Sequence, residues 1–222
     1  MFDVETGLII ELPLEMSSDV FLTPVRGGLN PLEILCGRME KVVPRKDMVF
    51  LSGHDEKHIP YGSYLAGKKL SLFRTDVQSA SERMMKASSM RRAKTMIRIN
   101  ACHTFADPEL IQGMVDMHCQ LKAAYTRLEG PPEWLGGEIY SGKELIDAHL
   151  IAVGEDRKDE QPGDILSSKK EKFIIGTYKP SVRGRWKNLN LSLAGRQSAA
   201  ALFEVIRRAP DPMTVTYRDF LE

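Results

Sequence analysis

Residues 95–130 read TMIRINACHTFADPELIQGMVDMHCQLKAAYTRLEG, and the rest of the chain is organised around them. The first part of this stretch alternates, with Ile97 and Ile99 on one face and Arg98 and Asn100 on the other. A period of two with β-branched residues is typical of a half-buried strand. We therefore expect the stretch to open with a strand.

A long helix is predicted directly after this strand. Asp107 suits an N-cap, because its side chain can accept hydrogen bonds from free backbone amides, and Pro108 suits the first helical position. Apolar residues then recur at steps of three and four, and Gly130 is followed by two prolines that cannot continue a helix. This pattern predicts a helix at about 108–129 whose apolar stripe covers a sheet.

The remaining segments mix strands and helices. Further amphipathic helices are expected near 31–42, 76–93 and 196–208. Alternation favours a strand at 145–153, although Ser141 and Glu144 resemble a capping box and leave a helix open there. Segments 172–178 and 185–193 are predicted to be paired strands joined by a hairpin. The order predicts an α+β fold, in which mainly antiparallel sheet segments pack against the long central helix.

Composition is typical of a globular protein with one domain. The chain has 222 residues, of which 42% are hydrophobic and 27% charged, which suits a single domain over 1–222. No apolar run is long enough to cross a bilayer, and the first residues lack the pattern of a signal peptide. The three cysteines have no paired spacing, which indicates a reducing compartment. We expect a cytoplasmic or nuclear protein that is not secreted, with a mobile charged loop at 154–168.

Charge is segregated along the chain, although the net charge is only +1. The first 25 residues carry acids and no base, whereas bases gather before the central strand and again in the predicted hairpin. Two aromatic residues lie among the bases of the hairpin, and stacking beside cationic side chains is a common way to hold a nucleic acid. The expected polyanion-binding residues are Arg83, Lys86, Arg91, Arg92, Lys94, Lys179, Arg183, Arg185, Trp186 and Lys187.

One segment resembles a known family. Residues 173–179, FIIGTYK, are followed by an alternating strand and a helix of small residues, and this order resembles the late strands of rhabdovirus matrix proteins. The N-terminus lacks the basic, proline-rich segment of that family. The resemblance implies a viral structural protein of the matrix type.

These observations favour a non-catalytic assembly or interaction protein. Its predicted partners are nucleic acid or an anionic membrane surface, together with further copies of the chain or a protein partner. A matrix-like viral protein carried in the virion fits this description. We predict no catalytic residue, metal site or cofactor, because the sequence holds no nucleophile elbow, phosphate-binding loop or zinc-protease pattern.

The alternative hypothesis is a small intracellular enzyme or a metal-binding protein. His54 and His58 are spaced to share one face of a helix and bind a metal, although the flanking glycine and proline favour a loop. A second group could converge if the central helix folds back on its strand, but successive strand residues face opposite ways. This group consists of Cys102, His103, His118 and Cys119.

Overall fold

The structure, a computed structural model, describes residues 4–182 and 185–222. Its strands are β1 (Val4–Glu11), β2 (Met48–Ser52), β3 (Ser71–Arg74), β4 (Ala93–Asn100), β5 (Tyr125–Leu128), β6 (Glu138–Ser141) and β7 (Ile175–Tyr178). Its helices are α1 (Asp19–Leu22), α2 (Pro31–Met39), α3 (Ile59–Gly67), α4 (Ala80–Ser89), α5 (Pro108–Leu121), α6 (Gly142–Gly154), α7 (Pro162–Ser167) and α8 (Arg196–Arg208). Within these described ranges no helix is both long and apolar enough to cross a membrane.

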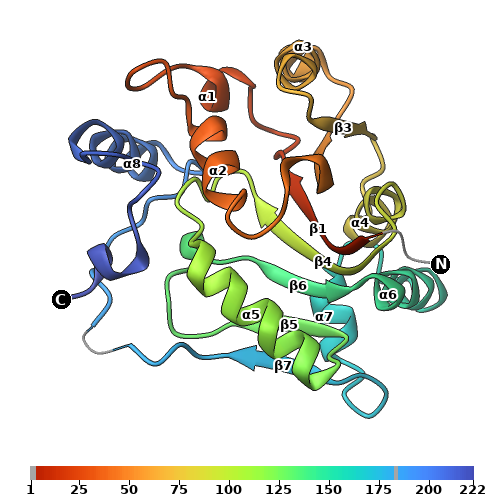
Figure 1. The fold of residues 1–222 in the computed structure, drawn as a ribbon. Coiled ribbons are helices and arrows are strands. Elements are labelled where there is room, and N and C mark those ends of the chain that lie inside the picture. The colour runs from red at the N-terminus through yellow and green to blue at the C-terminus, as the bar shows by residue number, and fades with distance from the viewer. Residues whose placement is uncertain (1–3, 183–184) are drawn as a thin grey trace.

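All of the described strands join one sheet of order β3-β2-β1-β4-β6-β5-β7 (Figure 1). The four strands β3, β2, β1 and β4 are parallel, and β5 is parallel to β7. Strand β6 is antiparallel to both of its neighbours. The predicted α+β fold with mainly antiparallel segments is therefore wrong, because the sheet is mostly parallel.

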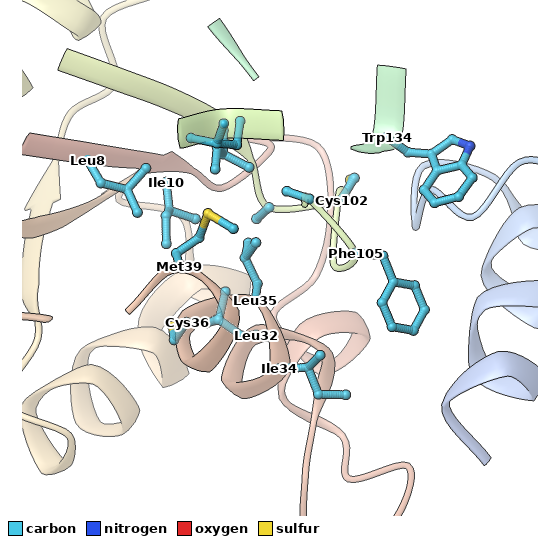
Figure 2. Close-up of a cluster of buried hydrophobic side chains, with 14 of the residues drawn as sticks. Leu8, Ile10, Leu32, Ile34, Leu35, Cys36, Met39, Cys102, Phe105 and Trp134 are labelled. Atoms are coloured by element: carbon cyan, nitrogen blue, oxygen red, sulfur yellow. The ribbon is translucent and has the colours of Figure 1, made fainter. Parts of the chain in front are cut away.

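Helices cover both faces of this sheet and create two cores. One core receives side chains from α2, α3, α5 and α8, and the other receives them from α4, α6 and α7. Figure 2 shows Leu8 and Ile10 of β1 directed at Leu35 and Met39 of α2, all of them almost completely buried. Apolar burial on both faces stabilises a parallel sheet, whose strands cannot expose one face to water.

The parallel arrangement also explains why periodicity was misleading. Every residue of β2, Met48–Ser52, is buried, so this strand carries no alternation of apolar and polar residues. Helix α3 follows β2, after the histidines whose flanking residues favoured a loop, and this helix completes a regular succession of strand and helix from β1 to β5. Such a succession is the pattern of a parallel sheet with crossover helices.

The central helix is shorter than predicted. Helix α5 begins as expected, because Asp107 accepts hydrogen bonds from the amides of Glu109 and Leu110. It ends at Leu121, because Lys122 adopts the left-handed conformation with φ 50°. The last apolar positions of the predicted helix belong instead to β5. The helices predicted near 31–42, 76–93 and 196–208 are present as α2, α4 and α8.

Two predicted strands are also corrected. Residues 145–153 form part of α6, which buries Leu145, Ala148 and Ala152 at helical spacing. The predicted hairpin is absent from the described residues, because β7 pairs with β5 and not with 185–193. In the segment between the two helices α6 and α7, Arg157 donates to Glu160 and Ser168. The mobility of 154–168 stays a prediction.

A buried ion pair joins α2 to the start of α5 and holds the C-terminal segment. Arg38 is completely buried in α2, and its Nη2 lies 3.7 Å from Oδ2 of Asp107. The same guanidinium donates to the carbonyls of Phe105 and Ala106, while Asp107 accepts from the amide of Tyr217 at 2.8 Å. One carboxylate thus caps α5, neutralises a buried cation and holds the last turn of the chain.

The change Asp107→Ala removes all three contacts and leaves Arg38 as an uncompensated buried charge. We expect a loss of about 3–5 kcal/mol in the free energy of unfolding, which is typical of a broken buried ion pair. Urea unfolding measures this loss. The matched control is Asp116→Ala on the exposed side of the same helix, where the carboxylate only accepts from Gln112. Equal stability losses for the two variants would contradict this account.

Candidate functional site

The parallel strands end at one edge of the sheet, which we call the carboxyl edge. Strands β1, β2, β3, β4, β5 and β7 end there, and the antiparallel β6 begins there. The chain builds β2 and β3 on one side of β1 and then returns to place β4 on the other side. Such a reversal leaves a crevice beyond the strand ends, which is where open α/β sheets bind ligands.

A network of four charged side chains fills the floor of this crevice. Arg98 donates from Nε and Nη2 to Oε2 of Glu11, at 2.8 and 2.5 Å. Arg83 of α4 donates from Nη2 to the other oxygen of Glu11 at 2.8 Å. Arg98 Nη1 also donates to Oε2 of Glu138 at 2.6 Å, and the hydroxyl of Tyr125 donates to Oε1 at 2.7 Å. The network therefore connects β1, β4, β6, β5 and α4.

The charges of this network stay fixed near neutral pH. Burial raises the pKa of the Glu11 carboxyl, but Arg98 and Arg83 outweigh burial and hold the pKa below its usual value. Burial lowers the pKa of Arg98, and the nearby carboxylates of Glu11 and Glu138 more than restore it. Two cations face two anions, so the floor of the crevice carries no net charge.

Two adjoining cavities lie over the network. The first, of about 550 Å³, lies at the ends of β1 and β4, and the second, of about 290 Å³, lies over β4, β6 and β5. Arg98 and Asn100 line both cavities and therefore lie between them. The first cavity is also lined by Glu11, Pro13, Leu14, Glu15, Gln78, Arg83 and Gln161.

Close backbone approach shapes the second cavity. A Cβ on Gly137 would lie 2.5 Å from the carbonyl oxygen of Arg98, and a Cβ on Gly136 would lie 2.5 Å from Cδ2 of Leu128. Only glycine fits at position 137, where the loop crosses so near to the backbone of β4, whereas the Leu128 side chain beside Gly136 could move. The pair Gly136–Gly137 thus brings the start of β6 against β4 and places Glu138 within reach of Arg98.

His103 lies between the second cavity and a third one of about 640 Å³. Its Nδ1 is buried and makes no hydrogen bond within the described part of the chain. Burial lowers the pKa of this imidazole, although nearby Glu133 raises it. His103 is therefore a neutral polar group at the wall of the candidate site.

The other cysteines and histidines proposed for chemistry do not converge. Cys102 is buried with its Sγ 3.4 Å from Sδ of Met16, whereas His118 pairs through Nδ1 with Oγ1 of Thr126 at 3.0 Å. Burial raises the pKa of the Cys102 thiol to about 12, so it is not a nucleophile at neutral pH. Cys119 is exposed on α5.

The histidines at 54 and 58 also have separate surroundings. His58 is completely buried, where Nδ1 lies 2.9 Å from the hydroxyl of Ser52 and Nε2 lies 3.0 Å from the carbonyl of Met16. His54 is exposed, and its amide donates to Asp76. His58 thus braces the end of β2 against the loop after β1.

The residues predicted to bind a polyanion are divided between two regions. The residues on and after α4 have partners within the chain. Arg83 pairs with Glu11, and Lys86 pairs with Glu82. Arg91 donates to Ser71, Lys94 pairs with Glu5, and Arg92 also makes an interaction. In the second group, Lys179 pairs with Glu129, Lys187 donates to the carbonyl of Asp219, and Arg185 and Trp186 run beside the chain end. Arg183 lies outside the described residues. Figure 1 places α4 and the C-terminus on opposite sides of the molecule, so the two groups do not form one surface. Whether either group holds an anion stays a prediction.

Most of the residues that line the crevice were not predicted from the sequence, although Arg83 and His103 were singled out there for other roles. Glu11, Asn100, Arg98 and Glu138 were not among the predicted site residues. The available signal was a charged residue inside an apolar strand, because Arg98 stands between Ile97 and Ile99. A buried charge of this kind requires a partner and often marks a functional position.

Comparison with known proteins identifies the fold. No family model matches the chain. A cytidylyltransferase from Leptospira borgpetersenii superposes with a TM-score of 0.79, over 98% of this chain and 92% of that one, at 14% identity. The chain has the nucleotidyltransferase fold. A synthetase for CMP:2-keto-3-deoxy-manno-octonic acid, solved with CTP, superposes with a TM-score of 0.60 over 90% of this chain and 96% of that one, at 10% identity.

A curated protein is also similar in sequence. The chain is 28% identical over 192 residues to the spore coat polysaccharide biosynthesis protein SpsF of Bacillus subtilis, covering 83% of this chain and 80% of that protein. The prediction of a viral, matrix-like, non-catalytic assembly protein is therefore wrong. Nucleic acid and anionic membranes are also wrong as its main partners, since the similar proteins are enzymes of nucleotide transfer and a protein of polysaccharide synthesis. These comparisons support neither a nuclear nor a virion location.

Glu11 is not free to hold a divalent cation at the carboxyl edge. Nucleotidyl and phosphoryl transfer commonly use Mg²⁺ held by one or two carboxylates and by substrate phosphates. Here Glu11 is paired with two guanidinium groups, and Ala101 and Cys102 directly after β4 carry no carboxylate, whereas Glu15 and Glu133 line the two cavities. The described residues contain no group of three or more His, Cys, Asp or Glu side chains placed for a metal. The charge of the crevice floor is therefore set by the pairing of Arg98 and Arg83 with Glu11 and Glu138.

Buried His118 makes stability depend on pH. Burial lowers the pKa of this imidazole to about 4, below its usual value of 6.5. The unfolded chain then binds the extra proton between these two values, so stability is complete above pH 6.5 and is lost as the pH falls toward 4. We expect a loss of up to about 3 kcal/mol across this window.

The change His118→Gln should remove this part of the pH dependence. Unfolding free energies of the wild type and the variant, measured from pH 7 to pH 4, give the difference. Exposed His54, changed to Gln, is the matched control. Identical slopes for the wild type and His118→Gln would show that His118 does not titrate differently on unfolding.

Proposed function

We propose that this chain is a nucleotidyltransferase that moves the nucleotidyl group of a nucleoside triphosphate to a sugar-type acceptor. The single observation that carries the proposal is the pair of adjoining cavities at the fold's ligand-binding edge, with Arg98 in the wall that they share. Similarity to SpsF supports an acceptor used in polysaccharide synthesis, and two structural neighbours support cytidine as the first nucleotide to test.

The reaction requires two ligands to meet end to end. An oxygen of the acceptor forms a bond to the α-phosphorus of the triphosphate, the bond from this phosphorus to the bridging oxygen breaks, and pyrophosphate leaves with that oxygen. The protein's contribution to such a transfer is mostly positioning and electrostatic stabilisation. Two adjoining cavities position the two ligands, and the guanidinium of Arg98 in their shared wall can donate hydrogen bonds to the transferred phosphate.

The cavities suggest a division of roles. The larger one, at the ends of β1 and β4, has room for the nucleotide, and Arg83 and Gln78 can donate to it. The smaller one, over β4, β6 and β5, has room for a sugar and offers Glu133 and His103 as hydrogen-bonding groups. Arg98 and Asn100 border both, so they are placed to contact the transferred phosphate.

The carboxylate of Glu11 limits how strongly this crevice attracts a triphosphate. It already occupies the donors of Arg98 and Arg83 that face the crevice floor. A phosphate must compete with this carboxylate or bind at the remaining donors of the two guanidinium groups. We therefore expect modest nucleotide affinity, with specificity set by the fit of both ligands.

The proposed location is the interior of the cell. Nucleoside triphosphates are made and used there, and the three cysteines of the chain are free in the structure.

The direct test incubates the purified chain with each of the four ribonucleoside triphosphates and a panel of sugars and sugar phosphates, with and without Mg²⁺. We expect pyrophosphate release with one nucleotide, preferably CTP, that depends on one class of acceptor. Binding of a nucleotide without any transfer would contradict the proposed reaction while leaving ligand recognition at this edge in place. Absence of both would overturn the proposal.

The change Arg98→Lys keeps one positive charge but removes the planar fork that spans Glu11 and Glu138. We expect kcat to fall about 100-fold, the usual effect of removing one donor that stabilises transition-state charge. Steady-state kinetics measure this, with a thermal melt to verify folding. Arg45→Lys, an ion-pairing arginine before the start of β2 at the opposite edge, is the control that should keep wild-type kcat.

The change Glu11→Gln removes the carboxylate that competes with phosphate. We expect the Kd for CTP to tighten about tenfold, which corresponds to about 1.4 kcal/mol. Titration calorimetry at fixed ionic strength measures the Kd. Glu5→Gln, at the other end of β1 and paired with Lys94, removes the same charge away from the crevice. A tighter Kd in both variants would point to general charge and not to the network.

A further inference from the structure

A separate cavity of about 320 Å³ lies beyond the candidate site, where β5 and β7 meet the end of α7. Arg127 stands between this cavity and the 290 Å³ cavity, because it lines both. The other lining residues come from α7 and β7 and the segment between them. They are Ser167, Lys170, Phe173, Ile174, Ile175 and Thr177.

The polar side chains around this cavity have no hydrogen-bonding or ion-pairing partner in the described part of the chain. Within the described chain Arg127, Lys170, Ser167 and Thr177 make no side-chain hydrogen bond and no ion pair, and no acidic residue is among the described residues that line the cavity. Both cations are exposed, and neither is paired with a carboxylate, whereas the neighbouring Lys169 pairs with Glu155 at 2.7 Å. Such a group has hydrogen-bonding capacity that only a ligand or water can use.

The sheet register explains why Arg127 has no partner. Arg127 is paired in register with Glu138 on one side and with Thr177 on the other, so the three side chains lie on the same face. Glu138 is the nearest carboxylate along this row, but Arg98 occupies its Oε2 and Tyr125 its Oε1. The charge network of the crevice therefore leaves the guanidinium of Arg127 unpaired.

The chemistry of this cavity selects an anion with an organic part. A guanidinium fork, an ammonium group and two hydroxyls match the three terminal oxygens and double charge of a phosphate monoester. Apolar side chains form the rest of the wall, and Ile174 is 56% exposed beside it. A single carboxylate would leave one of the two cations without a counter-charge.

We propose that this cavity binds the phosphate group of a small phosphorylated metabolite, held by Arg127, Lys170, Ser167 and Thr177. The site is distinct from the crevice between β1 and β4 and does not depend on the proposed nucleotidyl transfer. Its volume and its two cations suit one phosphate group and not an extended polyanion.

The test is titration calorimetry with inorganic phosphate at pH 8 and fixed ionic strength, with acetate as the comparison anion. We expect saturable phosphate binding that weakens at least tenfold in both Arg127→Met and Lys170→Met. The matched control is Lys172→Met, which removes the same charge two residues away, where the ammonium stacks on Phe173 and does not line the cavity. Lys172→Met should bind phosphate like the wild type.

Four results would overturn the proposal. The first is the absence of saturable phosphate binding in the wild type. The second is an equal loss in Lys172→Met, which would indicate a general charge effect. The third is a loss in Arg98→Lys with none in Lys170→Met, which would assign the phosphate to the crevice. Acetate binding as tightly as phosphate would contradict the requirement for a dianion.

Discussion

The carboxyl edge of this fold depends on one interaction, the hydrogen-bonded ion pair between Arg98 and Glu11. Both side chains lie within the sheet, at the end of β1 and near the end of β4, and neither would be stable there alone because a buried charge requires a partner. Their pairing holds together the two strands that border the crevice. Glu138, Tyr125 and Arg83 extend it to β6, β5 and α4.

The same interaction decides what each neighbouring cavity can hold. Because Glu11 and Glu138 neutralise Arg98 and Arg83, the crevice has no excess positive charge to attract a triphosphate. Because Glu138 already accepts from Arg98 and Tyr125, Arg127 has no carboxylate partner, and its unpaired charge lies between the 290 Å³ cavity and the cavity at β5, β7 and α7. Arg98, Glu138 and Arg127 lie in register across the sheet and set the charge of the crevice and of the cavity beside it. This arrangement differs from a fold in which one basic loop binds phosphate.

Sequence reasoning recovered the elements whose signals are local. The cap at Asp107 and the proline after it fixed the start of α5, and the apolar stripes fixed α2 and α8. It failed where pairing is non-local. Whether β7 pairs with β5 or with the next segment depends on burial by α7 and on register, which periodicity in 172–193 does not contain. The left-handed Lys122, which ends α5, has no glycine to mark it.

The site was missed for a related reason. Its residues, Glu11, Arg98 and Glu138, are far apart in the chain and become neighbours only through the order of the strands, which the sequence pattern does not contain. The central claim is that ligands bind at this edge, between β1 and β4. Backbone amide chemical shifts recorded during a CTP titration test it most directly. The account predicts saturable shifts at Leu12–Glu15, Asn100–His103 and Gly136–Glu138; shifts confined to the opposite edge, or to the basic residues of 179–187, would contradict it.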